Sequence, residues 1–126
     1  MPTAYAKRTT EDLVSTFAKT ASEHGEFMAA CDPRRANAKF DQMAKLYGEL
    51  RHRGLDAQRQ LLPLLDSDNP HIRFHVATYA LDFEPEPAVQ ALKNILHMES
   101  GALRFDARMT LEQWHKGEIR FSWVPR

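Results

Sequence analysis

The sequence predicts an all-α fold, a short α-α superhelix of about three antiparallel helix hairpins that ends in a short extended C-terminal tail. Apolar residues recur at the three- and four-residue spacing of a helix face through most of the chain. Prolines, glycines and short polar turns interrupt this pattern at intervals suited to hairpins. The last two predicted helix pairs also superpose when the chain is shifted by 30 residues, which aligns Leu62 with Leu92 and Ala77 with Ala107.

The first predicted hairpin follows a loose lead-in over residues 1–9. Its first helix begins at Thr10, which we expect to act as the N-cap, and Gly25 is expected to end or kink it. The second helix begins at Asp32-Pro33, a capping residue followed by proline, and Gly54 ends it. The residues expected to face inward are Leu13, Phe17, Ala21 and Met28 in the first helix, and Phe40, Met43, Tyr47 and Leu50 in the second.

The second predicted hairpin begins with a leucine-rich helix over residues 55–65, which Pro63 should kink. A polar turn follows, and its Asn69 and Pro70 cap and open a helix over about residues 71–82. The inward face of this helix is expected to consist of Ile72, Val76, Ala77, Ala80 and Leu81.

The third predicted hairpin joins a helix over about residues 87–97, opened by Pro87, to a helix over about residues 102–116. The tail, residues 118–126, alternates apolar and polar residues, which predicts an extended segment laid on the body by one face. The inward residues are expected to be Val89, Leu92 and Ile95, then Leu103, Ala107, Leu111 and Trp114, and in the tail Ile119, Phe121 and Trp123.

Residues 62–73, together with Ala77 and Leu81, resemble a HEAT repeat. The resemblance lies in a proline within the first helix, an acidic turn, and an arginine that opens the second helix. The resemblance implies a structural repeat motif that consists of Pro63, Asp66, Asp68, Pro70 and Arg73. In such repeats the arginine commonly bonds to the turn, so the resemblance implies that Arg73 pairs with a turn carboxylate or carbonyl, Asp66 or Asp68 being the candidates.

The chain from the Leu13-Val14 helix to Lys116-Gly117 also resembles a small bacterial family, a domain of unknown function with an armadillo-type fold. The resemblance covers most of residues 10–120. It implies the fold and a bacterial origin, and it transfers no activity and no catalytic residue.

Composition favours an ordinary globular protein. The 126 residues suit one HEAT-like domain over residues 1–126, and 17 basic against 17 acidic residues lack the broad positive field of a dedicated nucleic-acid binder. The single cysteine, Cys31, fits a reducing compartment. Because the N-terminus lacks a signal peptide and no apolar run could span a membrane, we expect a cytoplasmic protein with no membrane partner.

No residue pattern predicts catalysis, a cofactor or a metal, so we expect a protein that is not an enzyme. His71 and His75 have a spacing that can chelate a metal, but no further ligand lies nearby to complete the site. Cys31 precedes a helix start, which lowers thiol pKa values in general, but it has no adjacent catalytic base.

A helical array most often serves as a protein-interaction module, because stacked hairpins expose a row of side chains along one face. We therefore expect another protein as the partner, and an immunity- or antitoxin-like role is one specific version. The expected interaction surface consists of Lys39, His71, His75, Thr78, Arg104 and Arg108. The alternative is a nucleic-acid-binding protein that uses a local basic patch formed by Arg34, Arg35, Arg51 and Arg53. The sequence leaves the oligomeric state open.

Overall fold

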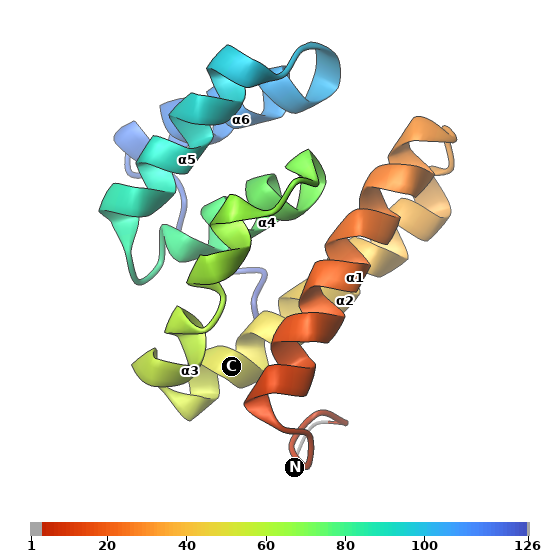
Figure 1. Ribbon diagram of the computed structural model, residues 1–126, viewed down its shortest axis with the longest axis vertical. Helices are drawn as coiled ribbons and strands as arrows, with labels where there is room; N and C mark the ends of the chain where they lie inside the picture. Colours follow the sequence, from red (N-terminus) through yellow and green to blue (C-terminus); the bar gives the residue numbers. More distant parts are fainter. Residues whose placement is uncertain (1–3, 126) are drawn as a thin grey trace. The chain divides into compact units, whose positions relative to one another are not determined.

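The structure, a computed structural model, describes residues 4–125. These residues form helices and no strand, which confirms the all-α prediction for the described chain (Figure 1). The elements are α1 (Thr10–Ala29), α2 (Pro33–Arg53), α3 (Leu55–Arg59), the 3-10 helix η1 (Leu62–Asp66), α4 (Pro70–Ala80), α5 (Pro85–Met98) and α6 (Gly101–His115). They group into two compact units: residues 4–61 with 123–125 form unit 1, and residues 62–122 form unit 2.

Helix α1 is continuous, and its N-cap is Thr9 rather than the predicted Thr10. Thr9 has extended backbone angles, and its hydroxyl accepts a hydrogen bond of 3.0 Å from the Asp12 amide. Gly25 does not interrupt the helix but lies buried within it. A single helical glycine costs only about 1 kcal/mol relative to alanine, which is a cost that the packing of a 20-residue helix can outweigh.

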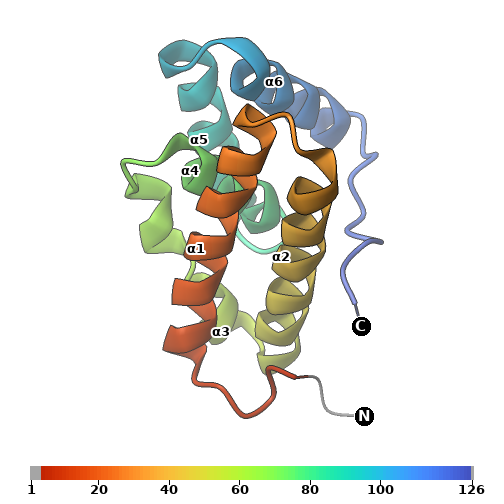
Figure 2. The same ribbon diagram turned by 90° about the vertical axis from the view of Figure 1, so that its right-hand side faces the viewer.

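Helix α2 begins and ends as predicted. The Asp32 side chain caps it by accepting from the Arg35 amide, Pro33 occupies the first helical position, and Gly54 follows the last residue at a φ of +107°. Helices α1 and α2 lie side by side and are joined by a short loop (Figures 1 and 2).

The seam between these two helices contains most of the residues predicted to face inward. Leu13, Phe17, Ala21, Met43, Tyr47 and Leu50 are fully buried. The prediction is wrong for Met28 and Phe40, whose exposed fractions are 52% and 37%. Both lie in the part of the hairpin nearer its connecting loop, and a two-helix hairpin buries only the line where its helices meet.

The segment predicted as one kinked helix is two short helices, α3 and η1. The ring of Pro63 would clash with the carbonyl of Arg59 if an α-helix continued through it, and α3 accordingly ends at Arg59. Within unit 1, a buried hydrogen bond of 2.8 Å connects α3 to α2. The side-chain Nε2 of Gln58 donates it to the Tyr47 hydroxyl.

The guanidinium of Arg53 binds the lead-in segment that precedes α1. Its Nη2 donates to three main-chain oxygens, its Nη1 to a hydroxyl and its Nε to a carboxylate. The acceptors are the carbonyls of Tyr5 (3.1 Å), Ala6 (3.3 Å) and Arg8 (2.6 Å), the hydroxyl of Thr10 (3.1 Å) and Oε2 of Glu49 (2.9 Å). The lead-in is therefore fastened over its described residues and is not loose as predicted; residues 1–3 lie outside the described chain.

In unit 2, helices α4 and α5 each begin at a proline. The Asn69 side chain caps α4 by accepting from the amides of His71 and Ile72. Helix α5 begins at Pro85, two residues before the predicted start at Pro87. Both prolines fit its first turn, where backbone amides have no acceptor within the helix.

The core of unit 2 forms where α4, α5 and α6 contact one another. Its fully buried members include Val76, Ala77, Ala80, Leu92, Ile95 and Ala107, and Leu81 and Leu111 are also buried, as predicted. Ile72, Val89, Leu103 and Trp114 are only partly buried. The small side chains of Ala77 and Ala107 suit the close approach of α4 and α6.

The alternation predicted for the tail ends at Phe121. This residue has a left-handed φ of +54° and is followed by a turn, so the next buried residue is Val124, while Trp123 is 37% exposed. Phe121 is buried in unit 2, with its ring centroid 6.3 Å from that of Tyr79. In unit 1, Val124 and Pro125 lie against Gly48 of α2.

We expect the effect of Gly48→Ala to depend on the tail. The added Cβ would lie 2.9 Å from the Pro125 carbonyl oxygen, which is too close. In a chain that ends at Ser122 the substitution should stabilise by about 1 kcal/mol through helix propensity, and in the full chain this gain should be lost. Urea unfolding of the full chain and of the chain that ends at Ser122, each with and without Gly48→Ala, measures the two effects on the free energy of unfolding. An equal effect in both chains would contradict the contact between Pro125 and Gly48.

We expect Arg53→Lys to loosen the lead-in, because an ammonium group cannot reproduce the planar fork that binds several carbonyls. The free energy of unfolding should fall by about 1–3 kcal/mol. Hydrogen exchange of the Arg8 amide, which donates to the Tyr5 carbonyl, should become faster. The matched control is Arg34→Lys at an exposed position of the same helix, which should change stability by less than about 0.5 kcal/mol. Unaltered exchange at Arg8 would argue against this role of Arg53.

Candidate functional site

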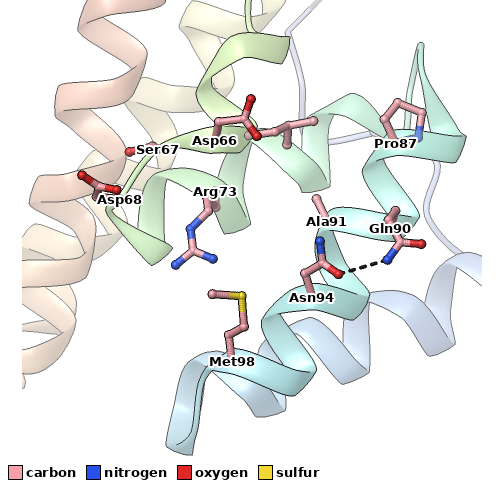
Figure 3. Close-up of a pocket in the computed structure, with 10 residues that line it drawn as sticks. Asp66, Ser67, Asp68, Arg73, Pro87, Gln90, Ala91, Asn94 and Met98 are labelled. Atoms are coloured by element: carbon pink, nitrogen blue, oxygen red, sulfur yellow. Dashed lines mark hydrogen bonds between the residues drawn. The ribbon is translucent and has the colours of Figure 1, made fainter.

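Unit 2 contains a groove of about 550 Å³ between the turn after η1 and helix α5 (Figure 3). One wall comes from η1, this turn and the first part of α4, and the other comes from one face of α5. The lining residues are Leu65, Asp66, Ser67, Asp68, Arg73, Pro87, Gln90, Ala91, Asn94 and Met98. The groove thus combines apolar surface, amides and charges of both signs.

Two amide side chains line the α5 wall. Gln90 and Asn94 lie one turn apart, and the Gln90 Nε2 donates to the Asn94 Oδ1 at 3.0 Å, as the dashed line in Figure 3 shows. Each amide has further polar atoms that this bond does not use, the Gln90 carbonyl oxygen as acceptor and the Asn94 nitrogen as donor. Beside them, Ala91 has only a methyl group, which leaves room for a ligand to approach the helix.

Arg73 brings the one cation among the lining residues, from α4. Its Nη2 lies 3.4 Å from Oε2 of Glu99, at the C-cap of α5, and its buried Nε has no acceptor among residues 4–125. The pairing with Asp66 or Asp68 that the HEAT resemblance implies is therefore wrong. Because α5 packs along α4, its end supplies the carboxylate, whereas the two aspartates lie on the exposed turn before α4.

Asp66 and Asp68 are exposed at the opposite wall, and neither has a hydrogen-bond or ion-pair partner within the described chain. The turn that carries them is internally bonded. The Ser67 amide donates to the Leu64 carbonyl at 3.1 Å, and the Asn69 amide donates to the Ser67 hydroxyl at 3.1 Å. Since Glu99 compensates the charge of Arg73, the two aspartates give the groove an excess of negative charge.

The predicted interaction surface does not coincide with the groove, and His75 is not on a surface at all. His75 is 7% exposed, with its ring centroid 5.1 Å from that of Phe74. It is buried because α4 contacts η1, α5 and α6, which leaves this helix without a broad free face. The neighbouring Thr78 hydroxyl donates to the Phe74 carbonyl.

The remaining members of that predicted surface are not among the lining residues of the groove. Lys39 belongs to unit 1 and pairs with Glu23 at 3.3 Å. On α6, Arg104 and Arg108 are exposed, and the Arg108 guanidinium stacks 5.6 Å from the Phe105 ring.

His71 is partly buried near Asp106 of α6. Desolvation of the Asp106 carboxyl raises its pKa, although the residue as a whole is exposed, and the positive charge of His71 opposes this rise.

The predicted basic patch is partly engaged in contacts within unit 1. Arg35 lies 3.6 Å from the Asp32 carboxylate and 5.7 Å from the Phe27 ring, and Arg53 holds the lead-in. Arg34 and Arg51 are exposed on the same helix.

Residues 4–125 contain no group of three or more histidine, cysteine, aspartate or glutamate side chains that could hold a metal ion. No described helix combines the length and the apolar character that crossing a membrane requires. Cys31 is exposed in the loop between α1 and α2, with a φ of +54°.

The groove residues that the sequence did not single out are those on α5. Gln90 and Asn94 have the four-residue spacing that places side chains on one helix face, which is the signal that could have found them. The sequence could not show that this face lies opposite the turn at Asp66 and Asp68.

We expect Arg73→Met to leave stability within about 1 kcal/mol of the natural protein. The change keeps the apolar stem, removes the unpaired Nε–H and loses only a long, partly exposed ion pair. As a control, Arg73→Ala also removes the stem and should cost more. Both are measured by urea unfolding, and a loss above about 2 kcal/mol for Arg73→Met would instead indicate a structural ion pair.

Comparison with known proteins gives a family and a similar structure. The model of a domain of unknown function, DUF2019, matches residues 11–115. None of the curated proteins that were compared matches the sequence. The crystal structure of the protein RPA1889 from Rhodopseudomonas palustris CGA009 is similar with a TM-score of 0.88 and 28% identity, covering 98% of this chain and 99% of that one. Neither description names an activity or a ligand.

Proposed function

We propose that this chain, which belongs to the DUF2019 family, is a non-catalytic protein-interaction module whose groove binds an extended segment of another protein. The observation that carries the proposal is the α5 wall, where two amides with unused polar atoms lie one turn apart, beside an alanine, in a groove of about 550 Å³.

The spacing of the amides suits a main chain. Residues four apart on a helix are separated by about 6 Å along its axis. Alternate residues of an extended strand are separated by about 6.6 Å. Gln90 and Asn94 can therefore exchange hydrogen bonds with the main-chain amides of alternate residues of a bound segment, in a manner that does not depend on its side chains.

Apolar lining residues supply the surface that a bound segment would desolvate. Leu65 and Ala91 line the groove, and Met98, whose exposed fraction is 68%, stands at one end (Figure 3). A methionine can adopt many shapes, which suits contact with varied side chains. Burying such exposed apolar area would contribute to affinity.

We further propose that the helices form a short HEAT-like array and that the chain works in the bacterial cytoplasm. The 30-residue offset between Leu62 and Leu92 supports the first point, and the lone Cys31 supports the second. Binding a segment of a toxin would be the immunity- or antitoxin-like form of this function.

The contacts of the basic residues favour a protein partner over a nucleic acid. Binding to a nucleic acid requires several cations that are free to contact phosphates and displace the counterions condensed there. In unit 1, Lys39 already pairs with Glu23, and Arg53 binds main-chain oxygens of the lead-in.

Selection of random peptides displayed on phage against the full chain tests this proposal. We expect enriched peptides whose binding is lost in Ala91→Arg, because the long side chain fills the groove. The matched control is Ala38→Arg, the same substitution at an exposed position of α2, which should bind as the natural protein does. Circular dichroism confirms that both variants are folded. Enriched peptides that bind Ala91→Arg unchanged would refute the groove as the site.

A further inference from the structure

We propose that the groove selects its partner by a lysine or arginine side chain whose cationic head lies beside Asp66 and Asp68. This inference rests on the proposed function, because it names the chemistry of the segment that the groove binds. It goes beyond that function by assigning specificity to the turn between η1 and α4.

The charge balance of the groove carries the inference. Arg73 is the one cation among the lining residues, and its Nη2 is paired with Glu99 at 3.4 Å. Asp66 and Asp68 also line the groove and have no partner within the described chain. A bound segment therefore meets two uncompensated carboxylates, and electrostatic complementarity favours a cation there.

The two walls of the groove would recognise different parts of a bound segment, one its main chain and the other a side chain. The amides of Gln90 and Asn94 lie on the α5 wall, and the aspartates lie on the wall formed by the turn (Figure 3). A main chain bonded to α5 can direct one side chain across the groove. The aliphatic stem of lysine or arginine can cover apolar surface such as Leu65, while its head stays hydrated beside the carboxylates.

The turn is prepared for this role before any ligand binds. Its backbone is fixed by the bond from the Ser67 amide to the Leu64 carbonyl and by that from the Asn69 amide to the Ser67 hydroxyl. A partner would therefore spend little binding energy on ordering the backbone of the turn. A metal ion is a poorer occupant, since residues 4–125 place no third carboxylate, histidine or cysteine close enough to Asp66 and Asp68 to complete a site.

Synthetic versions of the enriched peptides test the inference by fluorescence anisotropy with the full chain. We expect a lysine or arginine at one fixed position, and its replacement by methionine should weaken binding about three- to tenfold. The double variant Asp66→Asn with Asp68→Asn should weaken the natural peptide by a similar factor and leave the methionine peptide unaffected. The control is Asp41→Asn with Asp56→Asn, two exposed aspartates of unit 1, which should change neither.

The outcomes separate this inference from the proposed function. Peptides that are sensitive to Ala91→Arg but contain no fixed basic residue would leave the proposed function standing and overturn the inference. Equal weakening of the lysine and methionine peptides by the Asp66 and Asp68 variants would also overturn it. If no enriched peptide is sensitive to Ala91→Arg, both fall. Reversal of preference from lysine to glutamate by Asp66→Lys with Asp68→Lys would support the inference directly.

Discussion

The ends of α1, α3 and η1 and the starts of α2, α4 and α5 depend on where proline can be accommodated. A proline ring collides with the carbonyl four residues earlier in an α-helix and offers no amide hydrogen. The last residues of α1, α3 and η1 stand four positions before prolines, namely Pro33, Pro63 and Pro70. The same residue type is harmless in a first turn, so Pro33, Pro70 and Pro85 each open the helix that follows. This steric rule ends η1 at Asp66 and places the polar turn at residues 67–69, and with them one wall of the groove.

The features of the fold that could be predicted are those set by residues close together in the sequence. Proline and capping chemistry act within a few residues, so the starts of α2 and α4 and the end of α2 could be predicted from sequence, whereas α5 starts two residues before the prediction. The predictions that fail depend on what lies across from a residue. Phe40 has helical spacing from Met43 yet is exposed, and His75 occupies a position expected to be exposed yet is buried. Periodicity gives the direction of a side chain, and only packing decides what covers it.

The candidate site shows the same limit more strongly. Asp66, Asp68 and Arg73 could be named from the sequence because they belong to one continuous motif. Their pairing could not, since the partner of Arg73 is Glu99, a residue brought near by the packing of α5 along α4. That choice of partner matters for function. Because Glu99 of α5 neutralises Arg73, the carboxylates of Asp66 and Asp68 have no partner among residues 4–125. Residues that would form an ion pair within a HEAT repeat are thereby left as an acidic surface, which we propose to favour a basic partner.

The attachment of the lead-in through Arg53 has a consequence for how this protein can vary. Most of the bonds reach main-chain oxygens, those of Tyr5, Ala6 and Arg8, and such oxygens are present whatever the side chains are. The identity of residues 5–8 can therefore drift with little effect on the attachment, while exchange of the arginine even for lysine weakens it. In evolutionary terms, one position on α2 bears the constraint for a whole segment.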